Sequence, residues 1–358
     1  MRYTGGYSGR VPGTGIVNPG ESMKRFEGYM HGVNLGGWLS QCDHTRERYD
    51  SFICRDDIER IAEKGMDHVR VPVDYEVFER AEGFSYTDRL MDWAEAAGLN
   101  VILDLHKTYG FSFDSGEGED GFFDREDYQE KFYELWEKLA QRYGTLYKRL
   151  CFELLNEVTD KEYCDRWNSI AEKCVSRIRG RAGEIKILFG GYHNNSIEAV
   201  GDLALPFDEN IVYNFHCYEP LIFTHQGGHW VPGMDRAFRM PFDSTYGEYK
   251  KNSQCFLDCF SVTFDGYDEN AGLGEEFFEN LVKKAVDVAQ ERDVPLYCGE
   301  FGVIDLASPE DTLSWYRMIC SVFDKYGIAR AAWSYKEMDF GIFDERLSGV
   351  FDELVRVI

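Results

Sequence analysis

The feature that most constrains this chain is a short apolar run, CFELLNEV (Cys151–Val158), that ends in an amide and a carboxylate side by side. The apolar residues require burial, whereas Asn156 and Glu157 stand where an extended segment of this length should end. A second run, Val294–Val303, has the same form and carries Glu300. Buried strands that end in polar side chains are typical of parallel barrels, which place their functional groups at the carboxyl ends of the strands.

The rest of the chain alternates apolar runs with amphipathic helical patterns. Strands are expected at residues 29–35, 67–74, 100–105, 151–158, 185–189, 211–215, 294–303 and 328–335. Helices are expected at residues 55–64, 87–98, 126–143, 163–179, 275–291, 311–326 and 350–358, with Thr87 as the cap of the second. Eight strands alternating with helices predict an α/β fold, a single (β/α)8 TIM barrel.

The sixth and seventh strands are further apart in the sequence than any other neighbours. This spacing predicts an inserted subdomain at about residues 219–272, between strand 6 and helix 6, over the mouth of the barrel. Residues 1–22 are rich in glycine and are expected to form a flexible tail, which leaves residues 23–358 as one barrel domain.

Charge and cysteine content limit the partners and the compartment. A net charge of −25 argues against nucleic acid and anionic membranes and is compatible with a neutral ligand. The N-terminus lacks the apolar core of a secretory signal, which predicts a cytoplasmic protein, or a secreted one if a signal has been removed. The ten cysteines are then expected to be free thiols, with Cys151, Cys217 and Cys298 buried in strands. A monomer is expected.

The two carboxylates indicate the chemistry. A pair of carboxylates about 5 Å apart at one end of a barrel is what a retaining glycosidase requires. Glu157 is interpreted as the acid/base, with its pKa raised by a neighbouring charge, and Glu300 as the nucleophile. No cofactor or metal is expected.

Further residues at strand ends are expected to support the pair. Arg70 is interpreted as a structural ion pair, as a charge partner for Glu300, or as both. Tyr218 would orient Glu300, and Asn156 would reach the 2-hydroxyl of the sugar. The remaining candidates are His106 and His216 as hydrogen-bond partners and Trp333 as the floor under the sugar.

Two more tryptophans are candidates for sugar contact. Trp38 follows a pair of glycines and is interpreted either as a sugar platform or as barrel packing. Trp230 lies in the predicted insertion with other aromatic and polar residues, namely Phe223, His225, Gln226 and His229. Some of this group are expected to line subsites; the alternative is that they only attach the insertion to the barrel. His193, Asn194 and Asn195 have a weaker claim to sugar contact.

With these residues in place, the chain resembles glycoside hydrolase family 5, the cellulase family. HGVNLGGWL, HVRVP, DLH, LLNE, HCY, GEFG and AAWSY occur in the order of the family's motifs. The stretches YCGEFGV, IVYNFHCYEP, FTHQ and KEMDF resemble the endoglucanase C type of bacterial cellulase. The resemblance implies a TIM barrel with Glu157 as acid/base and Glu300 as nucleophile. It also implies cleavage of internal β-1,4 bonds in cellulose-type and mixed-linkage β-glucans, as polysaccharide or oligosaccharide.

The chain departs from the family pattern at two positions beside the site. Lys107 stands where many relatives have a second histidine, and Cys217 replaces a commoner aromatic residue, which puts the shape of the sugar subsites in doubt. Other interpretations stay open: an exo-β-1,3-glucanase, a β-mannanase, or a catalytically inactive carbohydrate-binding barrel. A metal-dependent barrel hydrolase built on Asp104, His106 and His216 is also conceivable, but the further ligands that it needs are missing from the pattern.

Overall fold

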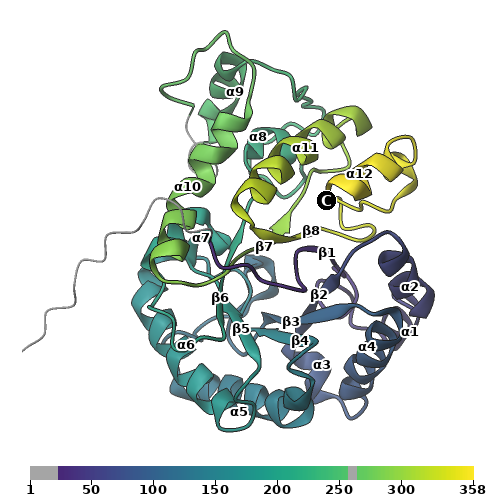
Figure 1. The fold of residues 1–358 in the computed structure, drawn as a ribbon, viewed down its shortest axis with the longest axis vertical. Helices are drawn as coiled ribbons and strands as arrows, with labels where there is room; N and C mark the ends of the chain where they lie inside the picture. The colour runs from purple at the N-terminus through teal and green to yellow at the C-terminus, as the bar shows by residue number, and fades with distance from the viewer. Residues whose placement is uncertain (1–22, 257–263) are drawn as a thin grey trace, which may run out of the picture.

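The computed structural model describes residues 23–256 and 264–358, and its centre is a closed barrel of parallel strands in the order β1 to β8 (Figure 1). β8 pairs with β1 and so closes the barrel. The strands are β1 His31–Asn34, β2 His68–Asp74, β3 Asn100–Lys107, β4 Leu150–Glu153, β5 Lys186–Phe189, β6 Ile211–His216, β7 Leu296–Phe301 and β8 Ala329–Ala332. The predicted TIM barrel is confirmed.

The long helices surround the barrel on its outer side (Figure 1). The helices of the described residues are α1 Arg46–Ser51, α2 Arg55–Glu63, α3 Tyr75–Glu79, α4 Gly83–Ala97, α5 Glu126–Tyr143, α6 Cys164–Arg179, α7 Tyr192–Asn195, α8 Leu221–Thr224, α9 Tyr246–Ser253, α10 Glu275–Glu291, α11 Pro309–Tyr326 and α12 Phe351–Val357. The bounds of α5 and α10 agree with the prediction. The short helices α1 and α3 were not expected.

Three local predictions are wrong. Thr87 lies inside α4 and does not cap it: its Oγ1 is 2.5 Å from the Tyr143 hydroxyl, which ties α4 to α5. The fourth strand ends at Glu153, so Asn156 and Glu157 lie in the loop that follows β4. Conversely, β3 extends beyond the prediction and includes His106.

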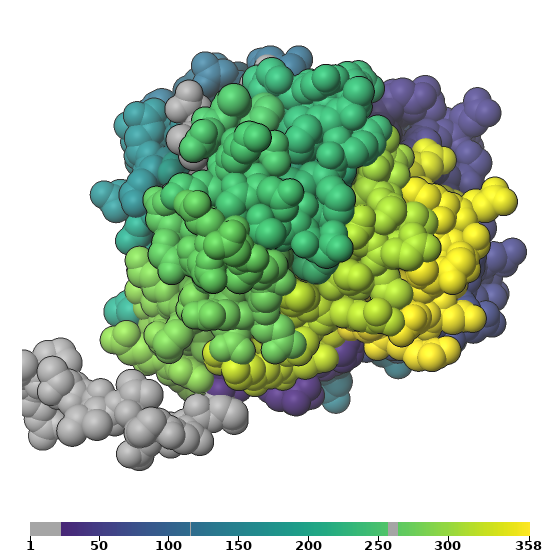
Figure 2. Space-filling view, turned by 90° about the horizontal axis from the view of Figure 1, so that it is seen from above, coloured from purple at the N-terminus to yellow at the C-terminus, as the bar shows by residue number. Residues whose placement is uncertain are grey.

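The long segment between β6 and α10 contains the short helices α8 and α9. In the space-filling view, residues of this segment (green) form a broad area of surface beside the part of the chain that forms α11 (Figure 2). Residues 257–263, with Cys259, lie outside the described residues. Between β5 and β6 the chain has only α7 and a 3₁₀ segment, Ile197–Asp202, in place of a long helix.

The end of the barrel at which the strands begin is closed by aromatic residues that precede β1. The rings of Phe26 and Tyr29 stack with their centroids 4.4 Å apart, and Phe26 meets the ring of Tyr297 edge-on at 5.7 Å. The hydroxyl of Tyr297 lies 2.8 Å from Nε2 of the buried His68. Small side chains on β8, Ala329 and Ala331, complete this apolar layer. This end of the barrel is therefore a packed core, and its buried His68 is paired with Tyr297 and Asp67.

Every described cysteine is a free thiol, and Cys151, Cys217 and Cys298 are buried as predicted. Within residues 23–256 and 264–358, none of the helices has the length and apolar character needed to cross a lipid bilayer.

Candidate active site

Glu300 lies within β7, at the carboxyl end of the barrel, and is 5 % exposed. Its Oε1 accepts a hydrogen bond from Arg70 Nη1 at 2.8 Å, and its Oε2 accepts one from the Tyr218 hydroxyl at 2.9 Å. Both donors stabilise the negative charge of the carboxylate. The preceding Gly299 is required for packing, because a Cβ there would lie 2.7 Å from Asn214 Oδ1 and 3.0 Å from His216 Nε2.

Arg70 is fully buried at the centre of this end of the barrel. Its guanidinium donates to both carboxylate oxygens of Glu153, at 2.7 and 2.8 Å, and lies 3.1 Å from Asp104 Oδ2. It also donates to Asn34 Oδ1 and Asn156 Oδ1, each at 2.9 Å. Burying an unpaired charge costs several kcal/mol, so this arginine is stable only because carboxylates surround it. Both interpretations of Arg70, structural ion pair and partner of Glu300, are consistent with this geometry.

Glu157 stands in the loop after β4 with a left-handed backbone (φ 47°) and is 9 % exposed. Burial raises the pKa of its carboxyl, although the hydrogen bond from Asn194 and the charges of His106 and Arg70 act in the opposite direction. A raised pKa suits a group that must carry a proton into the reaction. The sequence-based expectation attributed the raised pKa to a neighbouring charge, but desolvation is the larger cause.

His216, the last residue of β6, lies between the two carboxylates. Its Nδ1 is 2.7 Å from Glu157 Oε1 and 3.7 Å from Glu300 Oε2. Burial lowers the pKa of its imidazole to about 4, so the ring carries a single proton near neutral pH. With a carboxylate oxygen at 2.7 Å, that proton belongs on Nδ1, and Nε2 then accepts from the amide of Asn195 at 3.3 Å.

One oxygen of Glu157, one of Glu300 and a ring nitrogen of His216 all lie within 4.8 Å of one another. Such a trio also has the composition of a metal site. However, Arg70 and Tyr218 already occupy both oxygens of Glu300, and a guanidinium repels a cation. The short distance between the carboxylates instead matches retaining glycosidases, because inverting enzymes hold theirs further apart.

Asp104 orients His106 and does not have the surroundings of a metal ligand. Its Oδ2 lies 2.7 Å from His106 Nδ1 and is shared with Arg70. Burial acts to lower the pKa of His106, but the charge of Asp104 outweighs it and the pKa is raised. His106 Nε2 is 3.4 Å from Asn156 Nδ2. Asn156 directly precedes Glu157 in the chain, so both predicted residues lie beside the carboxylate pair.

The tryptophans differ in their roles. Trp333 follows β8, and its ring lies parallel to that of His106 with centroids 5.9 Å apart. Gly36 leaves room for the ring of Trp333, because a Cβ at position 36 would lie 2.8 Å from the indole. Of the two interpretations of Trp38, the sugar platform is wrong, because this residue has no exposed surface. Trp38 is part of the barrel packing, and its indole N–H donates to the Tyr49 carbonyl at 2.9 Å.

The aromatic and polar residues of the segment after β6 also divide into two kinds. Phe223 and Gln226 are buried, and the Gln226 amide bonds to Phe223 and Met240 backbone groups, so these two hold the segment together. Trp230 is 41 % exposed, and its ring lies 5.8 Å from that of His225, which in turn lies 5.2 Å from Tyr218. A line of rings thus leads from beside Glu300 to the surface.

Sequence reasoning missed two buried polar residues, Glu153 and Asn214, and the contact of Asn194 with Glu157. Glu153 on β4 anchors Arg70, and Asn214 on β6 donates to Glu153 Oε1 at 2.7 Å. Asn194 donates to Glu157 Oε2 at 3.0 Å. A buried glutamate inside the apolar run of β4 was the available signal for the first, because an unpaired carboxylate there requires a cation.

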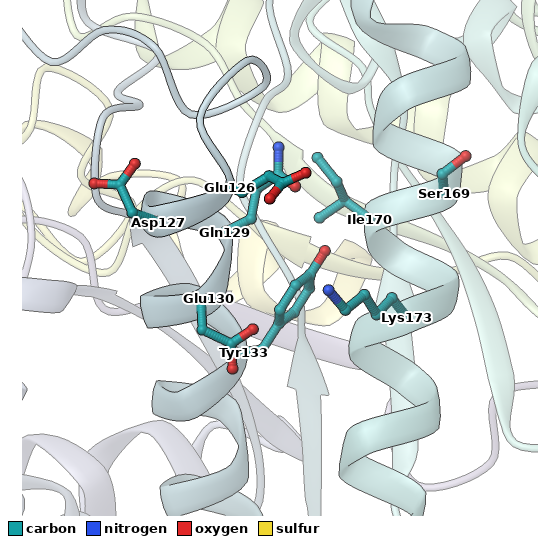
Figure 3. Close-up of a pocket in the computed structure, with 8 residues that line it drawn as sticks. All are labelled: Glu126, Asp127, Gln129, Glu130, Tyr133, Ser169, Ile170 and Lys173. Atoms are coloured by element: carbon teal, nitrogen blue, oxygen red, sulfur yellow. The ribbon is translucent and has the colours of Figure 1, made fainter.

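A hollow of about 550 Å³ lies on the outer wall of the barrel between α5 and α6 (Figure 3). Tyr133 of α5 and Lys173 of α6 lie against each other across it, with the ammonium 4.6 Å from the ring centroid. The other lining residues are Glu126, Asp127, Gln129, Glu130, Ser169 and Ile170. None of the residues that surround the carboxylate pair lines this hollow.

Comparison with known proteins identifies the family. Residues 31–339 match the family described as Cellulase (glycosyl hydrolase family 5). This chain belongs to glycosyl hydrolase family 5. It is 44 % identical over 314 residues to cellodextrinase A of Ruminococcus flavefaciens, with 86 % of each chain covered. It is 35 % identical to endoglucanase C of Acetivibrio thermocellus, with 92 % of this chain and 98 % of that one covered. The protein is therefore a glycoside hydrolase.

Solved structures of the family have the same fold. Endoglucanase Cel5A of Thermotoga maritima matches with a TM-score of 0.72 and 23 % identity, covering 92 % of this chain and 97 % of that one. Family membership confirms the resemblance read from the motifs. Of the two departures from the family pattern, Lys107 is paired with Glu76 and Glu117, at 2.5 and 2.9 Å, and Cys217 is buried with its backbone N–H donating to the Glu300 carbonyl.

Proposed function

We propose that this glycoside hydrolase is a retaining, endo-acting β-glucanase that cleaves internal β-1,4 bonds of cellulose-type and mixed-linkage β-glucans. The observation that carries the proposal is the carboxylate pair, with Glu300 held by two donors and Glu157 buried beside a neutral histidine. The first group is suited to remain an anion, and the second is suited to gain and lose a proton.

The reaction then proceeds in two halves. Glu300 attacks the anomeric carbon while Glu157 gives its proton to the leaving oxygen, and a glycosyl–enzyme ester forms on Glu300. Water enters, Glu157 takes a proton from it, and the resulting hydroxide releases the sugar from Glu300. The surrounding carboxylates stabilise the positive charge that develops on the sugar. Trp333 offers a flat apolar face beneath the sugar ring.

The choice of substrate rests on the relatives and on charge. The relatives with the highest identity reported above are named a cellodextrinase and an endoglucanase. Aromatic rings stack best on the faces of equatorially substituted glucose, which favours β-glucan over mannan. A chain with a net charge of −25 should bind neutral glucans well and polyanions such as pectin poorly.

The test combines viscosity, product analysis and stereochemistry. On carboxymethylcellulose and mixed-linkage glucan, viscosity should fall much faster than reducing ends appear, because an internal cut shortens a chain at once. Early products followed by NMR should have the β configuration. A proportional fall in viscosity with glucose as first product would indicate an exo enzyme, and an α product would rule out retention.

We also propose that Trp230 is a platform for a sugar unit outside the cleavage point. Trp230→Ala should raise KM for long cellodextrins several-fold with an unchanged melting temperature. Stacking on one aromatic ring contributes about 1 kcal/mol or more. Trp230→Phe should restore most of the affinity. A lowered melting temperature with normal KM in the remaining folded enzyme would instead assign the ring to packing.

A further inference from the structure

The turn α7 stands directly over the acid/base. Its residues His193, Asn194 and Asn195 all have left-handed backbones, with φ of 50°, 57° and 55°. The backbone N–H groups of His193 and Asn194 donate to the carbonyls of Thr159 and Val158, each at 3.0 Å. Three consecutive left-handed residues without a glycine are costly and are found where the surroundings fix them for a purpose. Here they are tied to the chain that immediately follows Glu157.

Both oxygens of Glu157 accept hydrogen bonds in this arrangement. His216 Nδ1 donates to Oε1 at 2.7 Å, and Asn194 Nδ2 donates to Oε2 at 3.0 Å. An ionised carboxylate is an acceptor only, so it can take both of these bonds at once. The geometry therefore corresponds to Glu157 as the base of the second half of the reaction.

The first half requires a proton on one of these oxygens. Oε1 faces a fixed donor, because the single proton of His216 is on Nδ1 and Asn195 satisfies Nε2. With His216 in this tautomer, the proton of Glu157 resides on Oε2, the oxygen that Asn194 faces. Asn194 is exposed whereas Asn195 is fully buried, so the amide of Asn194 has room to turn. A turned amide presents Oδ1, which accepts a bond from the protonated carboxyl.

We propose that Asn194 is a positioning residue that serves Glu157 in both protonation states, donating to Oε2 when it is ionised and turning away or accepting when it is protonated. Asn194 itself exchanges no proton: the proton on Oε2 passes to the leaving oxygen, and the attacking water returns one to Oε2. This role rests on the proposed function of Glu157.

The proposal predicts a change in the pH profile. The groups that face Glu157 are Asn194, His216, Arg70, His106, and the Tyr218–Glu300 pair. Burial is the largest influence and raises the pKa of Glu157, while the Asn194 hydrogen bond lowers it. Removing that bond leaves the other groups in place and raises the pKa further. The basic limb of kcat/KM, which follows loss of the proton from Glu157, must then move to higher pH.

The experiment measures kcat/KM against pH with cellotetraose for the unaltered enzyme and three variants. Asn194→Gly removes the amide and suits the left-handed backbone, whereas Asn194→Asp keeps the shape and adds a like charge. His193→Gly is the matched control, because it relieves the same backbone conformation and His193 makes no contact with Glu157. Melting temperatures are recorded for all four proteins.

We expect the basic limb to move to higher pH in Asn194→Gly, to move further in Asn194→Asp, and to stay in place in His193→Gly. Unshifted limbs in both Asn194 variants, or an equal shift in His193→Gly, would overturn the proposal. If Asn194→Gly does not fold, the isosteric Asn194→Asp decides alone. Failure of the unaltered enzyme to cleave cellotetraose would count against the proposed function and is a separate result.

Discussion

The two carboxylates that we propose to be catalytic lie in contrasting surroundings. Glu300 is part of β7, and its partners are a buried guanidinium and a tyrosine hydroxyl. Glu157 lies in a loop with a left-handed backbone, and its partners are a neutral histidine and an exposed amide. A permanent cation thus holds one carboxylate, whereas uncharged groups hold the other.

The difference follows from what each group must do. A nucleophile must stay ionised and in line with the anomeric carbon, so a rigid strand and a fixed positive charge are favourable. An acid/base changes its protonation state twice in every cycle, so a strong cation at the same distance would keep it ionised. The predictions below test this contrast, beginning with the largest expected effect.

Glu300→Gln should abolish turnover on every substrate. Without an anionic nucleophile the glycosyl–enzyme cannot form, and a loss on the order of 10⁴- to 10⁶-fold in kcat is expected. The measurement is initial rate on both cellotetraose and an activated aryl β-cellobioside, with melting temperature as the control for folding. Appreciable activity on the aryl substrate would show that Glu300 is not the nucleophile.

Glu157→Gln should separate the two substrates. Cellotetraose has a poor leaving group and should lose roughly 100- to 10,000-fold in kcat/KM, because it depends on a proton donor. The aryl substrate does not need that proton in the first half and should lose far less in kcat/KM. Equal losses on the two substrates would assign the acid role to another residue.

Arg70→Met should damage stability and activity together. The change leaves Glu153, Asp104 and Glu300 without their cation, and breaking a buried ion pair costs about 3–5 kcal/mol. Arg330→Met is the matched control, since Arg330 is equally buried but pairs with Asp324 and with backbone carbonyls. Urea denaturation should show losses for both variants, but only Arg70→Met should lower kcat in the folded enzyme.

The barrel could be predicted from the sequence because its signal is repeated around the chain. Apolar runs and helical periodicity recur with each unit, so errors in one element do not change the architecture. The local errors have physical causes. Thr87 suits both a cap and a helix interior, and its contact with Tyr143 decides between them. The end of β4 was misplaced because Leu154 and Leu155 are apolar and fully buried although they lie beyond the strand.

Most of the site could be predicted because its residues lie at or just beyond the carboxyl ends of strands. Glu300 lies in β7, His216 ends β6, and Glu157 lies in the loop just beyond β4, so their convergence followed from barrel geometry. Trp38 occupies a similar place but its indole faces inward, and nothing in the adjacent glycines indicates direction. Asn194 reaches Glu157 through an irregular left-handed turn, for which hydrophobic periodicity gives no signal.

Tyr218→Phe is the mildest test of the contrast between the two carboxylates. It removes the donor to Glu300 Oε2 and leaves Arg70 on Oε1, and the ring can keep its contacts with His225 and Phe340. Burial and the charge of Glu300 raise the pKa of Tyr218 well above its usual value, so the hydroxyl remains a donor throughout the assay range. A hydrogen bond to a charged group contributes about 1.5–3 kcal/mol, which corresponds to a roughly 10- to 100-fold loss in kcat/KM. Tyr335→Phe, which loses a bond to Asp57 away from the carboxylate pair, should keep its activity. If Tyr218→Phe is as active as the control, Arg70 alone is sufficient to hold the nucleophile.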